Sequence, residues 1–290
     1  MLKGIEAAGF AWTQVHAPPI SILVDRERSA RHGAALRTVL DATGLRLVIH
    51  GPDHLSAGTA ENDRSMYALF DYAAAVGAEY VVYHGANFEL LDGGVGAGDV
   101  RDRAHAEETS LRLMAGRLQS LGITLAVENL APVWPSAQRM CHDPETIRSL
   151  VRAVDSPQVT VLFDVGHAEI TANAFGGGDA ARSLTTVVAD VGLFHLHDNL
   201  GARLAGARGE SDSGLAGVDP LRLDLHLAPG AGRVCWHDLA PLFLQSAAPL
   251  ILEVRPPHRL DPLTLATATV QLLARGASDG EAVLDPAVAA

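Results

Sequence analysis

The sequence is constrained most by a recurring pattern, in which a short apolar segment stops abruptly at a carboxylate or an imidazole. The segment TVLFDVGHA, residues 160–168, shows it most clearly. Its first four residues predict a buried strand, Asp164 ends that strand, and His167 follows after Gly166, which gives the backbone room to turn. Ionisable groups at the end of a buried strand are costly unless they are solvated, paired or bound to a metal. Asp164 and His167 are therefore candidate functional residues.

Similar apolar segments recur along the chain at intervals of roughly 30–40 residues. Strands are predicted over seven segments, residues 10–15, 45–49, 80–83, 124–127, 160–163, 193–194 and 250–252. Helices are predicted over residues 25–43, 61–76, 144–154, 179–190, 236–247 and 261–275, and a further long helix ends at Leu121. This alternation predicts parallel strands that are joined by right-handed crossovers.

The number and spacing of these units favour an α/β barrel, the (β/α)8 TIM barrel. A closed barrel has eight strands and the sequence predicts seven, so the barrel starts after the first strand or is open at that edge. A doubly wound open sheet is the alternative, but it would gather ligands at one switch point rather than at nearly every strand end. We expect a single domain over residues 1–277 and a disordered tail over residues 278–290.

Nearly every predicted strand ends at a side chain that can bind a metal. These residues are His50, His84, Glu128, Asp164 with His167, His195 and Glu253, and the loop segment DLHLAPGAG adds Asp224 and His226. In a parallel barrel all strand carboxyl ends meet on one face, so we expect the side chains to converge there. Nitrogen and oxygen donors without thiolates suit a divalent ion such as zinc, manganese or cobalt. His197 and Asp198 are expected to orient the strand end at His195 rather than to bind metal.

Charge and composition restrict the kinds of binding partner and the compartment that we expect. The net charge of -12 disfavours nucleic acid, and Cys141 and Cys235 form no CxxC pattern and suggest no disulfide framework. No apolar run is long enough to cross a membrane, and the amino terminus lacks a signal-peptide core. We therefore expect a cytoplasmic protein that acts on a small molecule, and leave a homo-oligomer open.

Several strand-end motifs resemble those of the xylose isomerase-like TIM barrels. They are HGPDHLSAG, VVYHGAN, LAVENL, LFDVGHA, FHLHDN, DLHLAPGAG and LEVRP, and they run from His50 to Glu253. The superfamily holds sugar phosphate isomerases and epimerases, and also endonuclease IV. In the isomerase branch the resemblance implies a divalent metal, usually manganese, magnesium, zinc or cobalt. Its quartet of ligands would be Glu128, Asp164, His195 and Glu253.

This resemblance implies a metal-dependent isomerase or epimerase of a sugar or sugar phosphate. Our hypothesis is that Glu128 and Glu253 move the proton as base and acid, through an ene-diolate that the metal stabilises. His167, Trp134 and Arg255 are the expected substrate contacts.

The endonuclease IV branch is the alternative, a phosphodiesterase that holds three zinc ions. Every one of its ligand positions has a counterpart here: His50, His84, Glu128, Asp164, His167, His195, Asp224, His226 and Glu253. Asp53-His54-Leu55 stands where that branch places a wedge for DNA, which disfavours it. Against the epimerase branch, Gly201 stands where its arginine after the His195 motif is expected.

Overall fold

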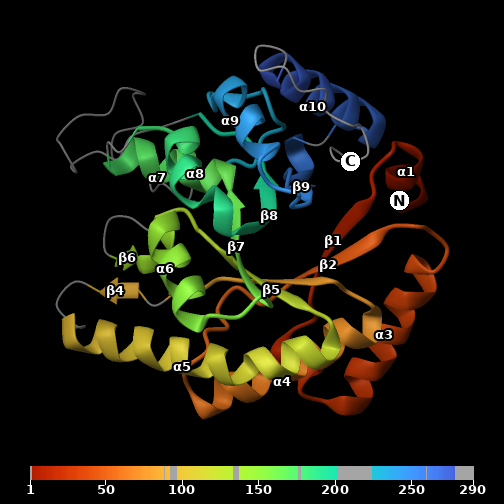
Figure 1. Cartoon of the computed structure of the whole chain (residues 1–290). Helices are drawn as coiled ribbons and strands as arrows, with labels where there is room; N and C mark the ends of the chain where they lie inside the picture. The colour runs from red at the N-terminus through yellow and green to blue at the C-terminus, as the bar shows by residue number, and fades with distance from the viewer. Residues whose placement is uncertain are drawn as a thin grey trace.

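Seven parallel strands form one sheet in chain order and curve into a nearly closed barrel at the centre of the molecule (Figure 1). The computed structural model describes residues 2–87, 89–91, 97–132, 137–175, 178–200, 224–258 and 260–277. The strands of the barrel are β1 (Trp12–His16), β2 (Arg46–His50), β3 (Tyr80–Tyr83), β5 (Thr124–Glu128), β7 (Val159–Asp164), β8 (Val191–Leu196) and β9 (Leu250–Leu252). All seven predicted strands are confirmed, and with them the barrel rather than the open sheet.

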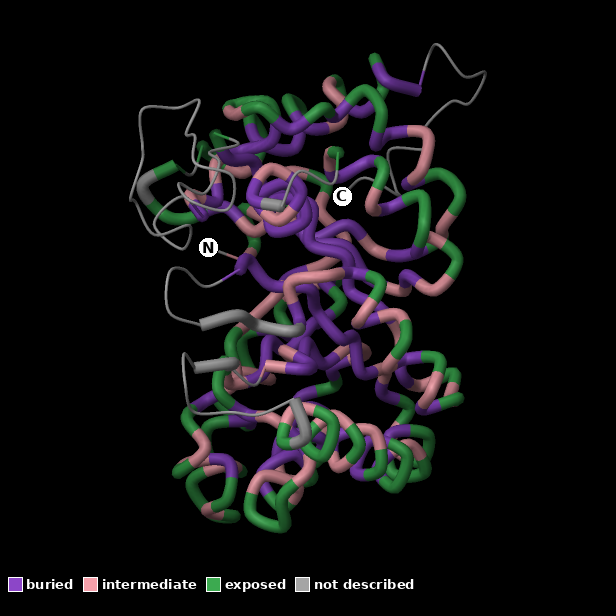
Figure 2. The backbone as a smooth tube through the Cα atoms, turned by 90° about the vertical axis from the view of Figure 1, so that its left-hand side faces the viewer, coloured by how far each residue is buried: buried purple, intermediate pink, exposed green. Residues whose placement is uncertain are grey.

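Helices follow the strands and cover the outside of the barrel. They are α1 (Leu2–Ala7), α2 (Ile20–Leu23), α3 (Arg26–Leu40), α4 (Ala60–Val76), α5 (Ala97–Leu121), α6 (Pro144–Val154), α7 (Val165–Phe175), α8 (Ala180–Val187), α9 (Trp236–Phe243) and α10 (Pro262–Ala277). Side chains at four helix starts accept hydrogen bonds from the free backbone N–H groups of the first turn: Asp25, Thr59, Asp143 and Asp179. The strands run through the buried centre, and the outer helix faces are exposed (Figure 2).

The barrel is open at one seam. The first strand β1 and the last strand β9 lie at the two ends of the sheet order, and no strand pairing joins them in the described part of the chain. Helix α1 contacts α10 beside this seam, so the two ends of the fold meet there (Figure 1). The predicted barrel of seven strands is therefore confirmed, and among the described residues its sheet is unpaired between β1 and β9.

Three features differ from the sequence-based expectation. Helix α7 begins at Val165, directly after β7, so Gly166 lies inside a helix and not in a turn. A second, two-stranded antiparallel sheet pairs β4 (Glu89–Leu91) with β6 (Ala137–Arg139). Helix α8 ends at Val187 and continues only as a short 3₁₀ turn over Val188–Asp190.

The predicted tail, residues 278–290, lies outside the described residues. Among the described helices, none is both long and apolar enough to span a membrane.

Candidate metal centre

The apolar interior of the barrel and the candidate site above it are built from two successive rows of inward-facing side chains. Six inward-facing apolar residues form a buried cluster: Val48, Val82, Ala126, Leu162, Leu193 and Ile251. Two positions after each of them comes a predicted site residue, in the same order: His50, His84, Glu128, Asp164, His195 and Glu253. Side chains two apart on a strand point to the same side, so each residue of the second row lies above one of the first. The structure thus brings together the residues that the sequence predicted.

Four of these side chains form the predicted quartet. Glu128, Asp164, His195 and Glu253 each offer one ligand atom, and these atoms lie within 4.8 Å of one another. Nδ1 of His195 lies 3.1 Å from Oε1 of Glu128, 3.2 Å from Oε2 of Glu253 and 3.7 Å from Oδ2 of Asp164. One imidazole nitrogen therefore faces three carboxylates, an arrangement suited to a divalent cation.

A second group shares Glu128 with the quartet. Nε2 of His84 lies 3.2 Å from Oε2 of Glu128, and Nε2 of His50 lies 3.7 Å from the same oxygen. The two imidazole nitrogens are 3.4 Å apart. Because Glu128 turns Oε1 to the quartet and Oε2 to these histidines, it would bridge two cations if both groups were filled.

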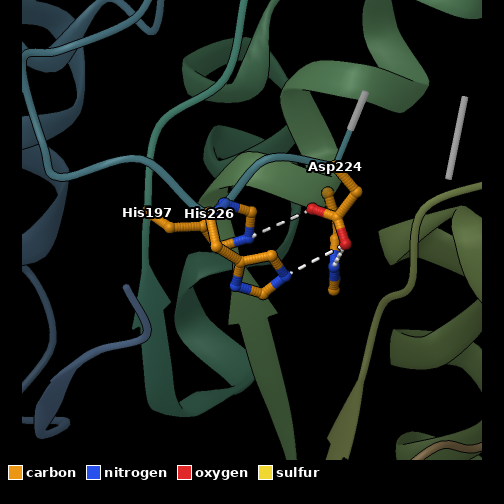
Figure 3. A group of neighbouring side chains, drawn as sticks. His197, Asp224 and His226 are labelled. Carbon is orange, nitrogen blue, oxygen red and sulfur yellow. Dashed lines mark hydrogen bonds and ion pairs between the residues drawn. The ribbon is translucent and has the colours of Figure 1, made fainter. Parts of the chain in front are cut away.

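A third group combines His167 with His197, Asp224 and His226. The last three are labelled in Figure 3. Oδ2 of Asp224 lies 3.0 Å from Nε2 of His226 and 3.4 Å from Nε2 of His167. The ring of His197 stacks on that of His226, with centroids 3.8 Å apart. Nε2 of His197 lies 3.9 Å from the other oxygen of Asp224. His197 was expected only to orient the strand end, but the structure places its ring among these potential ligands.

Backbone carbonyls fix the orientation of four of the imidazoles. Nδ1 bonds to a carbonyl oxygen in each case, that of Gly51 for His50, Asp53 for His84, Asn129 for His167 and Glu253 for His226. A carbonyl oxygen can only accept, so each Nδ1 carries a proton, and each Nε2 faces the site with a lone pair whenever the imidazole is neutral. Metal-binding histidines are commonly held in this way by a second hydrogen bond.

The residues fit a divalent metal because lone pairs face one another. Among the described residues, Oε2 of Glu128, Oδ2 of Asp164 and Oδ1 of Asp224 are buried and accept no hydrogen bond. A buried carboxylate oxygen without a partner costs several kcal/mol, on the order of a lost charged hydrogen bond or more. A proton or a cation between the facing atoms removes that cost, and a metal serves several of them at once.

Protons take this role when no metal is bound. Burial alone would lower the pKa of His167, but Asp164 and Asp224 raise it to about 10. Burial opposes a charge on His195 as well, yet Glu253 and Glu128 raise its pKa well above the ordinary value. Burial would raise the pKa of the Glu128 carboxyl, but His195 holds it well below its usual range. A metal that binds here must therefore displace protons.

Asp198 fixes the segment that carries Asp224 and His226. Its carboxylate accepts four hydrogen bonds, from the backbone N–H groups of Asn199, Gly230 and Val234 and from the Trp236 indole. Its own backbone pairs with Leu227 in both directions, at 2.9 Å. Asp198 thus ties the end of β8, which the sequence predicted it to orient, to the segment that carries the third ligand group.

Glu107 on α5 holds the turn that carries His84. The backbone N–H of Ala86 donates to both of its carboxylate oxygens, at 2.9 and 3.0 Å, and the Tyr83 hydroxyl donates to it as well. Ala86 has a φ of 51°, a conformation that a non-glycine residue adopts at a cost. Burial raises the pKa of Glu107 to about 7. Sequence reasoning missed this residue because an acidic residue on a helix gives no sign of its burial.

A cavity of about 390 Å³ opens above the ligand groups. His167 and Arg255, two predicted substrate contacts, line it together with His16. The guanidinium of Arg255 lies 3.4 Å from Oδ2 of Asp224, and about half of the side chain is exposed. The third predicted contact, Trp134, lies outside the described residues.

Comparison with known proteins agrees with this fold. The family model for the xylose isomerase-like TIM barrel matches residues 2–275. A D-tagatose 3-epimerase-like protein has a TM-score of 0.70 at 16% identity, over 96% of this chain and 94% of its own. The 3-keto-D-glucoside 4-epimerase of E. coli has a TM-score of 0.65 at 14% identity, over 93% and 91%. A xylose isomerase domain protein from Planctomyces limnophilus has a TM-score of 0.61 at 18% identity, over 96% and 92%.

No curated protein matches the chain in sequence. Structural likeness at these identities shows the fold alone, whereas the family match covers nearly all of the described barrel. The resemblance of the strand-end motifs is confirmed, and the chain belongs to the xylose isomerase-like TIM barrel family.

Proposed function

We propose that the protein is a divalent-metal-dependent isomerase or epimerase of a small sugar-like substrate. The observation that carries the proposal is the quartet of Glu128, Asp164, His195 and Glu253, in which two glutamates, at the end of β5 and directly after β9, lie around one candidate metal position. The cavity above it, about 390 Å³, lies at the low end of the range of small-molecule pockets, about 300–1,000 Å³. The structurally similar proteins named as sugar epimerases support the same reaction class.

Each residue of the site would have a role set by its position. When bound, a divalent cation supplies Lewis-acid stabilisation of the charge that develops on substrate oxygens. Glu128 and Glu253 hold and move the proton at the carbon next to the carbonyl group, as base and acid. His167 donates a hydrogen bond to a substrate oxygen from Nε2 when that nitrogen carries a proton, and Arg255 contacts the substrate at the cavity wall.

The test is turnover of a panel of ketoses and ketose phosphates in deuterated water by the metal-loaded chain. We expect deuterium at the carbon next to the carbonyl, and loss of kcat by at least about 100-fold in Glu253→Gln. The exposed Glu27→Gln is the matched control, because among the described residues the Glu27 carboxylate pairs with Arg31 on the surface of α3, away from the site. If no member of the panel is converted or exchanged, the proposal is wrong.

A second candidate, a multi-metal phosphodiesterase, is favoured by the two further ligand groups around His84 and Asp224. Such an enzyme uses several cations to generate hydroxide and to bind a phosphate. Elemental analysis separates the two candidates. About three zinc ions per chain, with cleavage of a phosphodiester or an abasic-site DNA, would favour the hydrolase. One exchangeable metal with ketose turnover would favour the isomerase.

A further inference from the structure

Gln14 on β1 is a polar side chain in the inward-facing row that is otherwise apolar. It pairs in register with Val48, and it precedes His16 by two positions as Val48 precedes His50. An amide in such a position is costly unless it is hydrogen-bonded. Its Nε2 lies 3.1 Å from Oε1 of Glu253, and its Oε1 lies 2.8 Å from Nε2 of His195. Both ends of the amide therefore bond to the quartet.

The carboxylate of Glu253 decides which way this amide points. A carboxylate oxygen accepts, so the NH₂ group of Gln14 must face it and the amide oxygen must face His195. Nε2 of His195 then carries the proton and donates to Gln14. The other ring nitrogen, Nδ1, faces the carboxylates of the quartet, and once it has given up its own proton its lone pair would be free for a cation held there.

His195 differs in this respect from the other potential ligands. Four of them, His50, His84, His167 and His226, give their second nitrogen to a backbone carbonyl, which no substitution removes. The second nitrogen of His195 donates instead to a side chain, that of Gln14, within the part of the chain that the structure describes. It also reaches from β1 to His195 on β8 and to Glu253 beyond β9, across the seam where the strands do not pair.

We propose that Gln14 is a positioning residue of the quartet. It fixes the tautomer of His195 and holds one oxygen of Glu253, so that Nδ1 and the other carboxylate oxygen would be available to a cation held by the quartet. This role depends on the proposed metal centre but not on the reaction that the centre catalyses. The open seam then has a function. The edge strand β1 does not pair with β9, but its Gln14 side chain reaches across the seam and supports two residues of the quartet.

The test is a cobalt titration of the metal-free chain, followed by the visible absorption of the bound ion. Gln14→Met keeps the size of the side chain and removes both hydrogen bonds. Gln14→Glu keeps an acceptor for His195 and removes the donor to Glu253. Gln119→Met, at an exposed position of α5, is the matched control. Glu253→Gln identifies which binding class belongs to the quartet.

We expect Gln14→Met to weaken cobalt binding in the quartet class by about 10–100-fold and to change its absorption spectrum. The other binding classes and the melting temperature of the metal-free chain stay as in Gln119→Met. Gln14→Glu should bind cobalt in the quartet class more weakly than the wild type, because two carboxylates then face each other. This variant provides the test if Gln14→Met does not fold. Unchanged affinity and spectrum, or equal loss in every class, would overturn the role of Gln14. A wild-type chain that binds no cobalt would overturn the metal centre itself.

Discussion

Glu128 is the side chain on which two ligand groups depend. One of its oxygens faces His195 in the quartet, and the other faces His84 and His50. Among the ligand groups Glu253 belongs to the quartet, with Oε2 at 3.2 Å from Nδ1 of His195; its 3.7 Å contact with His226 is to Nδ1, the nitrogen that donates to a backbone carbonyl. Two glutamates of the same site thus differ in how many cations each would hold.

This difference predicts unequal losses of metal. Glu128→Gln should weaken two binding classes, each by more than the roughly 10–100-fold that loss of a supporting hydrogen bond costs. Glu253→Gln should weaken one. Elemental analysis after dialysis against a graded series of chelator concentrations measures both, with Glu27→Gln as the control. Equal losses in the two variants would contradict the bridging position of Glu128.

Helix α7 shows how an element is shaped by the site it carries. Gly166 lies in its first turn, and a Cβ atom built there would come within 2.0 Å of the His197 ring. The glycine is therefore required by the close approach of an imidazole and not by a turn. Gly116 on α5 is its counterpart, because a Cβ atom there meets nothing within 4 Å.

The two glycines should respond in opposite directions to alanine. Gly116→Ala should stabilise the protein by about 0.5–1 kcal/mol through helix propensity. Gly166→Ala should destabilise it by about 1–3 kcal/mol, because His197 must move. It should also weaken metal binding in the group of Asp224. Urea denaturation and cobalt titration of both variants test this, and a stabilised Gly166→Ala would contradict the packing argument.

Asp198 gives a second prediction at the scale of a segment. Its carboxylate accepts four hydrogen bonds that hold the segment after residue 224. Asp198→Asn presents an NH₂ group to donors, so we expect a loss of about 2–4 kcal/mol in the free energy of unfolding. The exposed Asp41→Asn is the control, because the Asp41 carboxylate pairs with the exposed Arg37 within the part of the chain that the structure describes. Equal stability of the two variants would show that the four bonds are replaced by water.

The elements of this fold could be predicted because each signal is local. Strand ends, capping residues such as Asp143 and stop residues such as Gly77 act within a few positions of the chain. Helix α7 was missed because its first residues, Val165 to His167, follow a buried strand without a break. The pairing of β4 with β6 was missed because it joins segments more than 40 residues apart.

At the scale of the whole molecule, the predicted ligands converge because every parallel strand ends on the same face. Side chains two positions apart on a strand lie on the same face. The row of histidines and carboxylates could therefore be found from the sequence. Gln14, Glu107 and His197 could not be assigned in the same way. Their roles depend on a partner that lies far away in the chain, such as Glu253 for Gln14. The signal that could have found Gln14 is a polar residue two positions before His16, where the other strands carry apolar residues.

The charge balance of the site couples the stability of the whole barrel to metal and to pH. In the metal-free chain the pKa of His167 is raised to about 10, by Asp164 and Asp224 against the effect of burial. A raised histidine pKa stabilises the folded state fully below the unfolded value of about 6.5, and this stabilisation is lost as the pH rises towards 10. Metal binding has the opposite dependence, because fewer protons compete for the ligands as the pH rises.

The difference in melting temperature between the metal-loaded and the metal-free chain should therefore widen from pH 7 to pH 9. A metal at 100 times its Kd stabilises the folded state by about 2.7 kcal/mol, which raises the melting temperature by roughly 4–6 °C in a chain of this size. Calorimetric scans with and without chelator at both pH values measure the gap. In Glu128→Gln, which removes the shared carboxylate, the gap should shrink at both. A gap that narrows as the pH rises would mean that protons on His167 and its neighbours do not compete with the metal.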